Sequence, residues 1–231
     1  MRNTLSVLKN QKNELIADKE QIILFVMFPA LAFIQARVLE LDYGIYPYQI
    51  VSMIGLMFAL SGFVMMMPQV IAEHRENGSL RFMVMSGIKP HSYLLGLGGF
   101  YFILGMITTG VFAVIGEMSA DVLINFTVVM ALGIICSVIL ASIIGILSKN
   151  RQKAMGYAFP IGFIIMFLPM FADMLEPLAP ILDLTFINRL SYLLMSGNLT
   201  DSINHVVVIL INIAVLLTIF TGLFKVKGLK K

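Results

Sequence analysis

The residues of this chain that could carry out chemistry gather in one segment between two long apolar stretches. That segment contains Glu73, His74, Arg75 and Glu76 in a row. A glutamate beside a histidine could begin a zinc hydrolase site, but no second histidine follows in the required register. The glycine-rich loop ending in Lys and Ser or Thr, which would hold the phosphates of ATP, is also missing from the sequence. We therefore expect no catalytic residue, cofactor or metal site in this chain.

The same segment has the pattern of a short helix set between two bends. Asn77 and Gly78 are typical of a helix stop, Ser79 can cap a new helix, and Gly87 and Pro90 can end it. The apolar stripe of the new helix would consist of Leu80, Met83 and Val84. Such a helix could act as a lever that docks in a cleft of another protein, with the preceding charges fixing its register. The alternative is a plain connection between two helices.

The elements that position this segment are apolar helices long enough to cross a membrane. Of the 231 residues, 59% are hydrophobic and only 13% are charged, which is too apolar for a water-soluble domain. A helix needs roughly 20 residues to span a bilayer, and the apolar runs are continuous rather than alternating as in a membrane β-barrel. The predicted spanning helices are 21–36, 48–71, 93–116, 122–147, 154–172 and 205–224. The expected fold class is an all-α polytopic membrane protein with six transmembrane helices in residues 21–224.

The basic residues predict which side of the membrane each end occupies. All 16 Lys and Arg residues except Arg37 and Arg189 lie before the first helix, between helices two and three, between helices four and five, or after helix six. Because Lys and Arg accumulate in short cytoplasmic segments, both termini are expected in the cytoplasm of a multi-pass cell-membrane protein. The pI of about 9.0 then reflects contact with anionic lipid headgroups, and no nucleic-acid partner is expected.

Three further segments carry expectations of their own. Residues 1–20 have apolar residues at helical spacing and are expected to form an amphipathic cytoplasmic helix in the membrane interface, although a solvated tail is the alternative. Residues 173–204 form an apolar but interrupted outer loop, expected to contain short re-entrant or interfacial helices. These helices would either gate the passage of a substrate or only cover the ends of the spanning helices. Residues 225–231 form a basic cytoplasmic tail.

The fourth helix has small residues on one face. They recur every four positions as Gly133, Ser137, Ala141 and Gly145. Small side chains allow two helix backbones to approach closely, so this face is expected to pack against another helix. The partner could belong to the same chain or to a second copy.

Predicted helices two to six contain no Asp, Glu, Lys, Arg or His, apart from His205 at the start of the sixth. Carriers driven by ions, and many channels, keep charged or protonatable groups inside the membrane although each is costly there. This pattern disfavours a channel or an ion-coupled carrier.

The segment from Ala72 to Gly96 resembles the cytosolic motif of ABC-2-type permeases. In that motif, acidic and basic residues precede Gly-Thr/Ser-Leu, a short apolar helix follows, and a turn with small residues and Pro leads to Leu-Leu-Gly. The matching residues here are Glu73, Arg75 and Glu76, then Gly78-Ser79-Leu80, then Ser86-Gly87-Ile88-Lys89-Pro90, then Leu94-Leu95-Gly96. The six helices and the long outer loop before the last one agree with the same family.

The resemblance implies a permease subunit that pairs with a second copy or a similar permease and binds cytosolic ABC ATPase subunits, which hold the ATP. It implies an exporter of an amphipathic substrate such as a peptide, a drug or a lipid. The ATPase-coupling residues would be those of segment 72–92: Glu73, Arg75, Glu76, Gly78, Ser79, Leu80 and Met83. The alternatives are a non-transporting membrane immunity or regulatory subunit, and the disfavoured channel or ion-coupled carrier.

Overall fold

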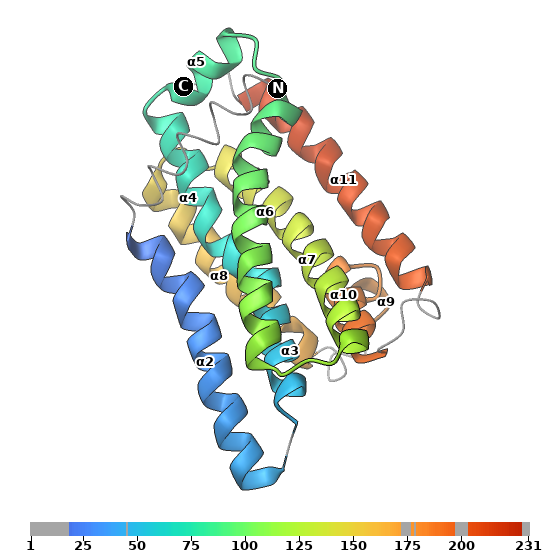
Figure 1. The fold of residues 1–231 in the computed structure, drawn as a ribbon. Helices are drawn as coiled ribbons and strands as arrows, with labels where there is room; N and C mark the ends of the chain where they lie inside the picture. Colours follow the sequence, from blue (N-terminus) through green and yellow to red (C-terminus); the bar gives the residue numbers. More distant parts are fainter. Residues whose placement is uncertain (1–18, 45, 172–176, 178, 197–202, 228–231) are drawn as a thin grey trace.

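The structure is a helical bundle, seen in a computed structural model that describes residues 19–44, 46–171, 177, 179–196 and 203–227 (Figure 1). Within those ranges, six helical stretches are long and apolar enough to cross a membrane. These six are α2 (Lys19–Tyr43), the continuous stretch Pro47–Glu76, α6 (Pro90–Ile115), α7 (Ala120–Leu147), α8 (Arg151–Phe171) and α11 (Ile203–Lys227). The prediction of an all-α, six-helix membrane protein is confirmed.

Shorter elements complete the described chain. The helix α5 (Ser79–Met85) joins the second and third spanning stretches, and α9 (Ala179–Leu182) and α10 (Phe186–Ser196) lie in the predicted outer loop. Most of the predicted interfacial helix, residues 1–18, lies outside the described residues, and Lys19 already begins α2. Of the predicted basic tail, Lys225 and Lys227 belong to the last turn of α11.

The first spanning helix is longer than predicted. It was expected to end at Ala36, but α2 continues through Arg37 and Glu40 to Tyr43 and stops where Gly44 adopts a φ of +63°. Charged side chains mark the edge of the apolar layer without ending a helix, whereas the left-handed glycine does end it. Arg37 pairs with Glu40 at 3.0 Å and with Glu117, in the α6–α7 connection, at 3.1 Å. This end of α2 therefore lies beside the α6–α7 connection.

The stretch Pro47–Glu76 and α7 form the centre of the bundle. Of their most apolar windows, 83% and 72% respectively are buried, against 11–33% in the other four spanning helices. The remaining four are peripheral, and in Figure 1 α2 and α11 stand on opposite sides of the bundle. Because the peripheral helices are apolar on their exposed faces, those faces suit lipid or another membrane helix.

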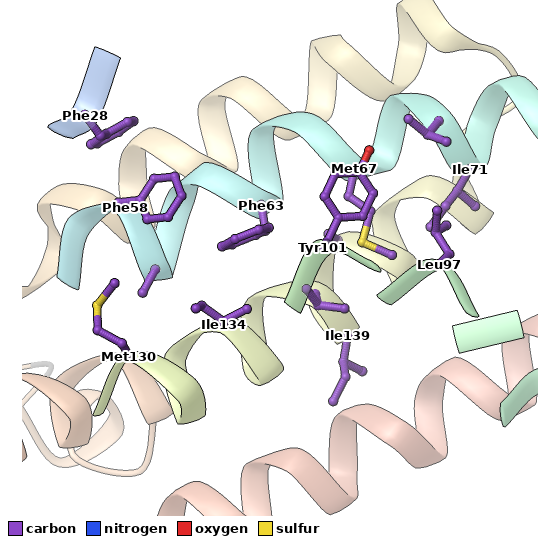
Figure 2. Packing of buried hydrophobic residues seen from close by; sticks show 14 of the residues in the cluster. Phe28, Phe58, Phe63, Met67, Ile71, Leu97, Tyr101, Met130, Ile134 and Ile139 are labelled. Atoms are coloured by element: carbon purple, nitrogen blue, oxygen red, sulfur yellow. The ribbon is translucent and has the colours of Figure 1, made fainter. Parts of the chain in front are cut away.

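Aromatic rings fill the space between the central and peripheral helices (Figure 2). The ring centroid of Phe58 lies 5.4 Å from that of Phe28, 5.3 Å from that of Phe63 and 5.8 Å from that of Phe112. These separations fall within the favourable range for tilted and edge-to-face aromatic pairs. The cluster therefore ties α2 and α6 to the central helix at one level of the membrane.

The central stretch contains a π-helical segment that the sequence did not predict. It consists of α3 (Pro47–Met57), the π-helical η1 (Phe58–Gly62) and α4 (Phe63–Glu76). A π-turn disturbs the regular i→i−4 pairing of the backbone. The Ser137 hydroxyl of α7 lies 2.6 Å from the Ala59 carbonyl oxygen and 2.9 Å from that of Leu60, so its single hydrogen can serve both acceptors. A polar contact thus fixes α7 against the widened turn.

The small-residue face of α7 lies against the central stretch of the same chain. Gly133, Ser137, Ala141 and Gly145 are all buried. A Cβ placed on Gly133 would lie 3.2 Å from the Cβ of Ala59, and one on Gly145 would lie 2.6 Å from the Cβ of Ile71. At Gly133, Ser137 and Gly145, the neighbour is therefore a helix of this chain.

Candidate functional site

The short helix α5 stands at one end of the bundle, between two corners made by glycines (Figure 1). Gly78 has a φ of +74° and Gly87 a φ of +81°, which is left-handed backbone that favours glycine. Gly78 is the N-cap and Ser79 is the first helical residue, with no side-chain capping bond, so the prediction that Ser79 caps the helix is wrong. Pro90 begins α6 rather than ending α5, as suits a residue without a backbone N–H.

The two sides of α5 face different surroundings. Leu80 is 1% exposed within the main hydrophobic core, and Met83 and Val84 are half-buried against that core. Phe82 and Met85 are 69% and 65% exposed. The stripe predicted to dock with a partner therefore points into the bundle of this chain. The apolar side chains that α5 leaves available are Phe82 and Met85, which the sequence analysis did not single out.

Arg75, in the last turn of α4, binds the end of another helix. Its Nη1 donates to the carbonyl oxygen of Ile146 at 2.9 Å and to that of Ser148 at 3.1 Å. The last carbonyls of α7 have no partners within the helix and carry partial negative charge, so a guanidinium both satisfies and stabilises them. Arg75 therefore joins the end of α4 to the end of α7.

The two glutamates on either side of Arg75 reach the start of α8. The Oε2 of Glu76 accepts a hydrogen bond from the backbone N–H of Arg151 at 3.2 Å, and the Oε2 of Glu73 lies 3.7 Å from the Arg151 guanidinium. A carboxylate at a helix N-terminus satisfies a free N–H and complements the helix dipole. We call Glu73, Arg75 and Glu76, with their contacts to residues 146–151, the α4 clamp.

The α4 clamp uses three of the residues that the sequence predicts to couple the permease to its ATPase. The structure brings the three side chains together, but against the α7–α8 connection of the same chain. Because the partners lie some 70 positions further along the sequence, no local pattern could have indicated them. Gly78 and Ser79 remain exposed at the corner before α5.

His74, for which the sequence offers no second histidine to complete a metal site, makes a structural contact. Its Nδ1 lies 3.0 Å from the hydroxyl of Tyr93, which is fully buried at the start of α6. The Tyr93 ring in turn lies 5.4 Å from the ring of Phe224 in α11. A buried phenol normally needs a hydrogen-bond partner, and His74 provides one. This end of the bundle thus links α4, α6 and α11 as well as α7 and α8.

Comparison with known proteins identifies the family. The family model for the ABC-2 family transporter protein matches residues 34–224, from within α2 to within α11. A search of curated proteins returned no match. The matched range includes the end of α2, the four spanning stretches that follow it, most of α11, the α4 clamp and α5. The chain therefore belongs to the ABC-2 family of transporter proteins and is a multi-pass membrane permease component of an ABC transporter.

Proposed function

We propose that this permease couples ATP hydrolysis by a separate cytosolic ABC ATPase to the export of an amphipathic substrate. The observation that carries the proposal is the position of α5. It is anchored to the bundle through Leu80, bent away by two glycine corners, and presents Phe82 and Met85 to the outside. An exposed aromatic ring beside a second apolar side chain is the kind of anchor that fills a pocket in a partner.

The α4 clamp gives the docked helix a route into the membrane. A displacement of α5 would move the end of α4, because only Asn77 and Gly78 separate them. Arg75 and Glu76 would carry that movement to the end of α7 and the start of α8. Small helix shifts are one of the known ways in which a protein switches between two states. In this proposal, the residues expected to dock with the ATPase instead transmit its movement.

A second permease copy, or a similar permease, would complete the transport path. The apolar faces of α2, α8 and α11 are largely exposed in the described chain and offer room for such a partner as well as for lipid. Membership of the ABC-2 family supports both an ABC ATPase partner and pairing with a second permease.

Copurification tests the proposed function. The tagged chain is extracted from its native membrane in mild detergent and the recovered proteins are identified. We expect an ABC-type ATPase in the eluate, and ATP-dependent transport when both are reconstituted in liposomes. If the chain is recovered without any ATPase, and export is unchanged in cells that lack the chain, the proposed function is wrong. The non-transporting immunity or regulatory role would then replace it.

The orientation is a separate prediction, with the α5 end of the bundle in the cytoplasm. Asn77, Asn150 and Ser119 are each replaced by cysteine in a Cys136→Ser background, because Cys136 is the only native cysteine. In intact cells, an impermeant thiol reagent should label only position 119, next to the α6–α7 turn. Positions 77 and 150 should react only after permeabilisation. Labelling of either one in intact cells would reverse the orientation.

A further inference from the structure

At the end of the bundle opposite α5, an arginine and a histidine join α10 to α11 (Figure 1). Nη1 of Arg189 lies 3.1 Å from Nδ1 of His205, and both residues are half-buried. The ring of Tyr192, one helical turn after Arg189, lies beside the same imidazole, with the ring centroids 5.6 Å apart. Contacts that converge on His205 therefore hold the first turn of α11 to the middle of α10.

The contact with Arg189 requires a neutral imidazole. A guanidinium stays charged and has only hydrogen-bond donors, so Nδ1 of His205 must accept the bond with its lone pair. The single ring proton of the neutral form is then on Nε2. Protonation would turn the acceptor into a second donor and would place two cations 3.1 Å apart. The packed arrangement of α10 and α11 therefore accepts only the uncharged ring.

The carboxylates of the neighbouring elements do not offset this change of charge. Asp183, just before α10, accepts from Arg189 Nε through its backbone carbonyl, and its carboxylate accepts from Asn188 Nδ2 at 2.9 Å. The only charged residue of α7 is Asp121, which lines a cavity of about 670 Å³ between α3, α7, α8 and α10. The helix α6 has no Asp, Glu, Lys or Arg. Among the described residues, no carboxylate forms an ion pair with Arg189 or His205.

The outer part of α11 has few other contacts to hold it in place. Of the six spanning helices, α11 is the least buried, at 11% of its most apolar window. Further along α11, Asn212 Nδ2 donates to the carbonyl oxygen of Leu184 at 2.9 Å, which fixes α11 to the residues just before α10. If the contact at His205 were lost, the first two turns of α11 could move while the level of Asn212 stayed in place.

We propose that protonation of His205 releases the start of α11 from α10, so that this joint responds to acid. Histidine ordinarily changes its charge between about pH 5 and 8. The separated arrangement can bind a proton that the packed arrangement excludes, so lowering the pH favours separation. Because Ser191, Leu194 and Met195 of α10 line the cavity, the joint would also control one of its walls.

The orientation proposed above would expose this joint to the outside of the cell. The movement itself depends on neither that orientation nor an ATPase, so it is tested on the purified chain in nanodiscs. Failure of this test would leave the proposed export function standing, and failure of the copurification would leave this joint standing.

Quenching of a fluorophore by tryptophan measures the separation, because the chain has no native tryptophan and a single cysteine. In a Cys136→Ser background, Met195→Trp places the quencher on α10 and Asn204→Cys carries a bimane label beside His205 on α11. Met195 is 83% exposed and Asn204 is also exposed, so neither change disturbs the core. The same labelled chain without the tryptophan corrects for direct effects of pH on bimane.

Quenching should fall at least roughly twofold between pH 8 and pH 5 in the chain that keeps His205. His205→Asn should stay quenched at both pH values, because the amide Oδ1 can accept from Arg189 and takes up no proton in this range. His205→Lys, which is cationic throughout, should be weakly quenched at both. Arg189→Gln should lose the pH response, because it removes the opposing charge.

The matched control is His91→Asn, which changes an exposed histidine at the α5 end of the bundle and should keep the full response to acid. Unchanged quenching from pH 8 to pH 5 in the chain that keeps His205 would overturn the proposal. A fall in quenching that persists in His205→Asn would also overturn it, because another group would then be responsible. These two results decide the question even if His205→Lys fails to fold.

Discussion

Replacing Gly145 by leucine is expected to lower the thermal unfolding midpoint of the purified protein by roughly 2–12 °C. A Cβ at this position would lie 2.6 Å from the Cβ of Ile71 and 3.0 Å from the backbone oxygen of Pro68. Neither atom is at the free end of a flexible side chain, so α7 would have to move away from α4. Overpacking of this kind costs about 1–3 kcal/mol, and each kcal/mol corresponds to about 2–4 °C for a chain of this length.

The matched control is Gly110→Leu in α6. No atom lies within 4 Å of a Cβ built on Gly110, so the same change of residue type adds a side chain in open space. It should leave the midpoint near that of the wild-type protein. Equal midpoints for the two variants would show that α7 does not pack closely against α4 at this level.

Replacing Gly78 by valine is expected to reduce ATP-dependent export roughly tenfold while leaving insertion and extraction normal. The position has a φ of +74°, and no atom lies within 4 Å of a Cβ built there, so the effect is conformational and not steric crowding by neighbours. A β-branched residue in this region is strained by about 1–3 kcal/mol. That strain would turn α5 away from the orientation in which Phe82 and Met85 are presented together.

Gly78→Asn is the control, because asparagine tolerates left-handed backbone far better than valine does. Export should then stay close to the wild-type level. The measurement is uptake of substrate into inverted vesicles that contain matched amounts of each variant and its ATPase. A similar loss of export in both variants would mean that the site needs the absence of a side chain at position 78, and not the left-handed backbone.

The sequence predicted the spanning helices well because their signal is local. Long apolar runs, the glycine stops at 78 and 87, and the composition of segment 72–92 are all readable within a few turns. The resemblance to the ABC-2 family rested on the same segment, and the family match agrees with it. The end of α2 was misplaced because charge was read as a stop, although only Gly44 ends the helix.

Features that depend on distant contacts could not be read in the same way. In α5, both faces are apolar, so the sequence could not tell whether Leu80 or Phe82 faces the bundle. The π-turn at Phe58–Gly62 has no local signature, and its contact with Ser137 joins residues 77 and 78 positions apart. The cavity beside Asn125 likewise exists only because α3, α7, α8 and α10 converge.

The intrachain contacts of Glu73, Arg75 and Glu76 could not be read from the sequence for the same reason, and the role of these residues in ATPase coupling stays a prediction. Charges next to a loop suggest docking with a partner, but here they satisfy the ends of α7 and α8. A Glu76→Lys variant would therefore disturb the α8 N-terminus as well as any docking surface. It is a poor test of coupling, and an exposed residue of α5 is a better one.

Whether α5 docks with the ATPase through Phe82 is measured by recovering the ATPase with a tagged Phe82→Ala permease. The Phe82 ring is 69% exposed, so its removal should cost the bundle little, whereas an aromatic anchor in a partner pocket is worth about 2 kcal/mol or more. Phe171→Ala is the control, since its ring is 49% exposed at the other end of α8. We expect at least roughly tenfold lower ATPase recovery with Phe82→Ala and wild-type recovery with Phe171→Ala. Wild-type recovery and wild-type stimulation of ATP hydrolysis with Phe82→Ala would contradict it.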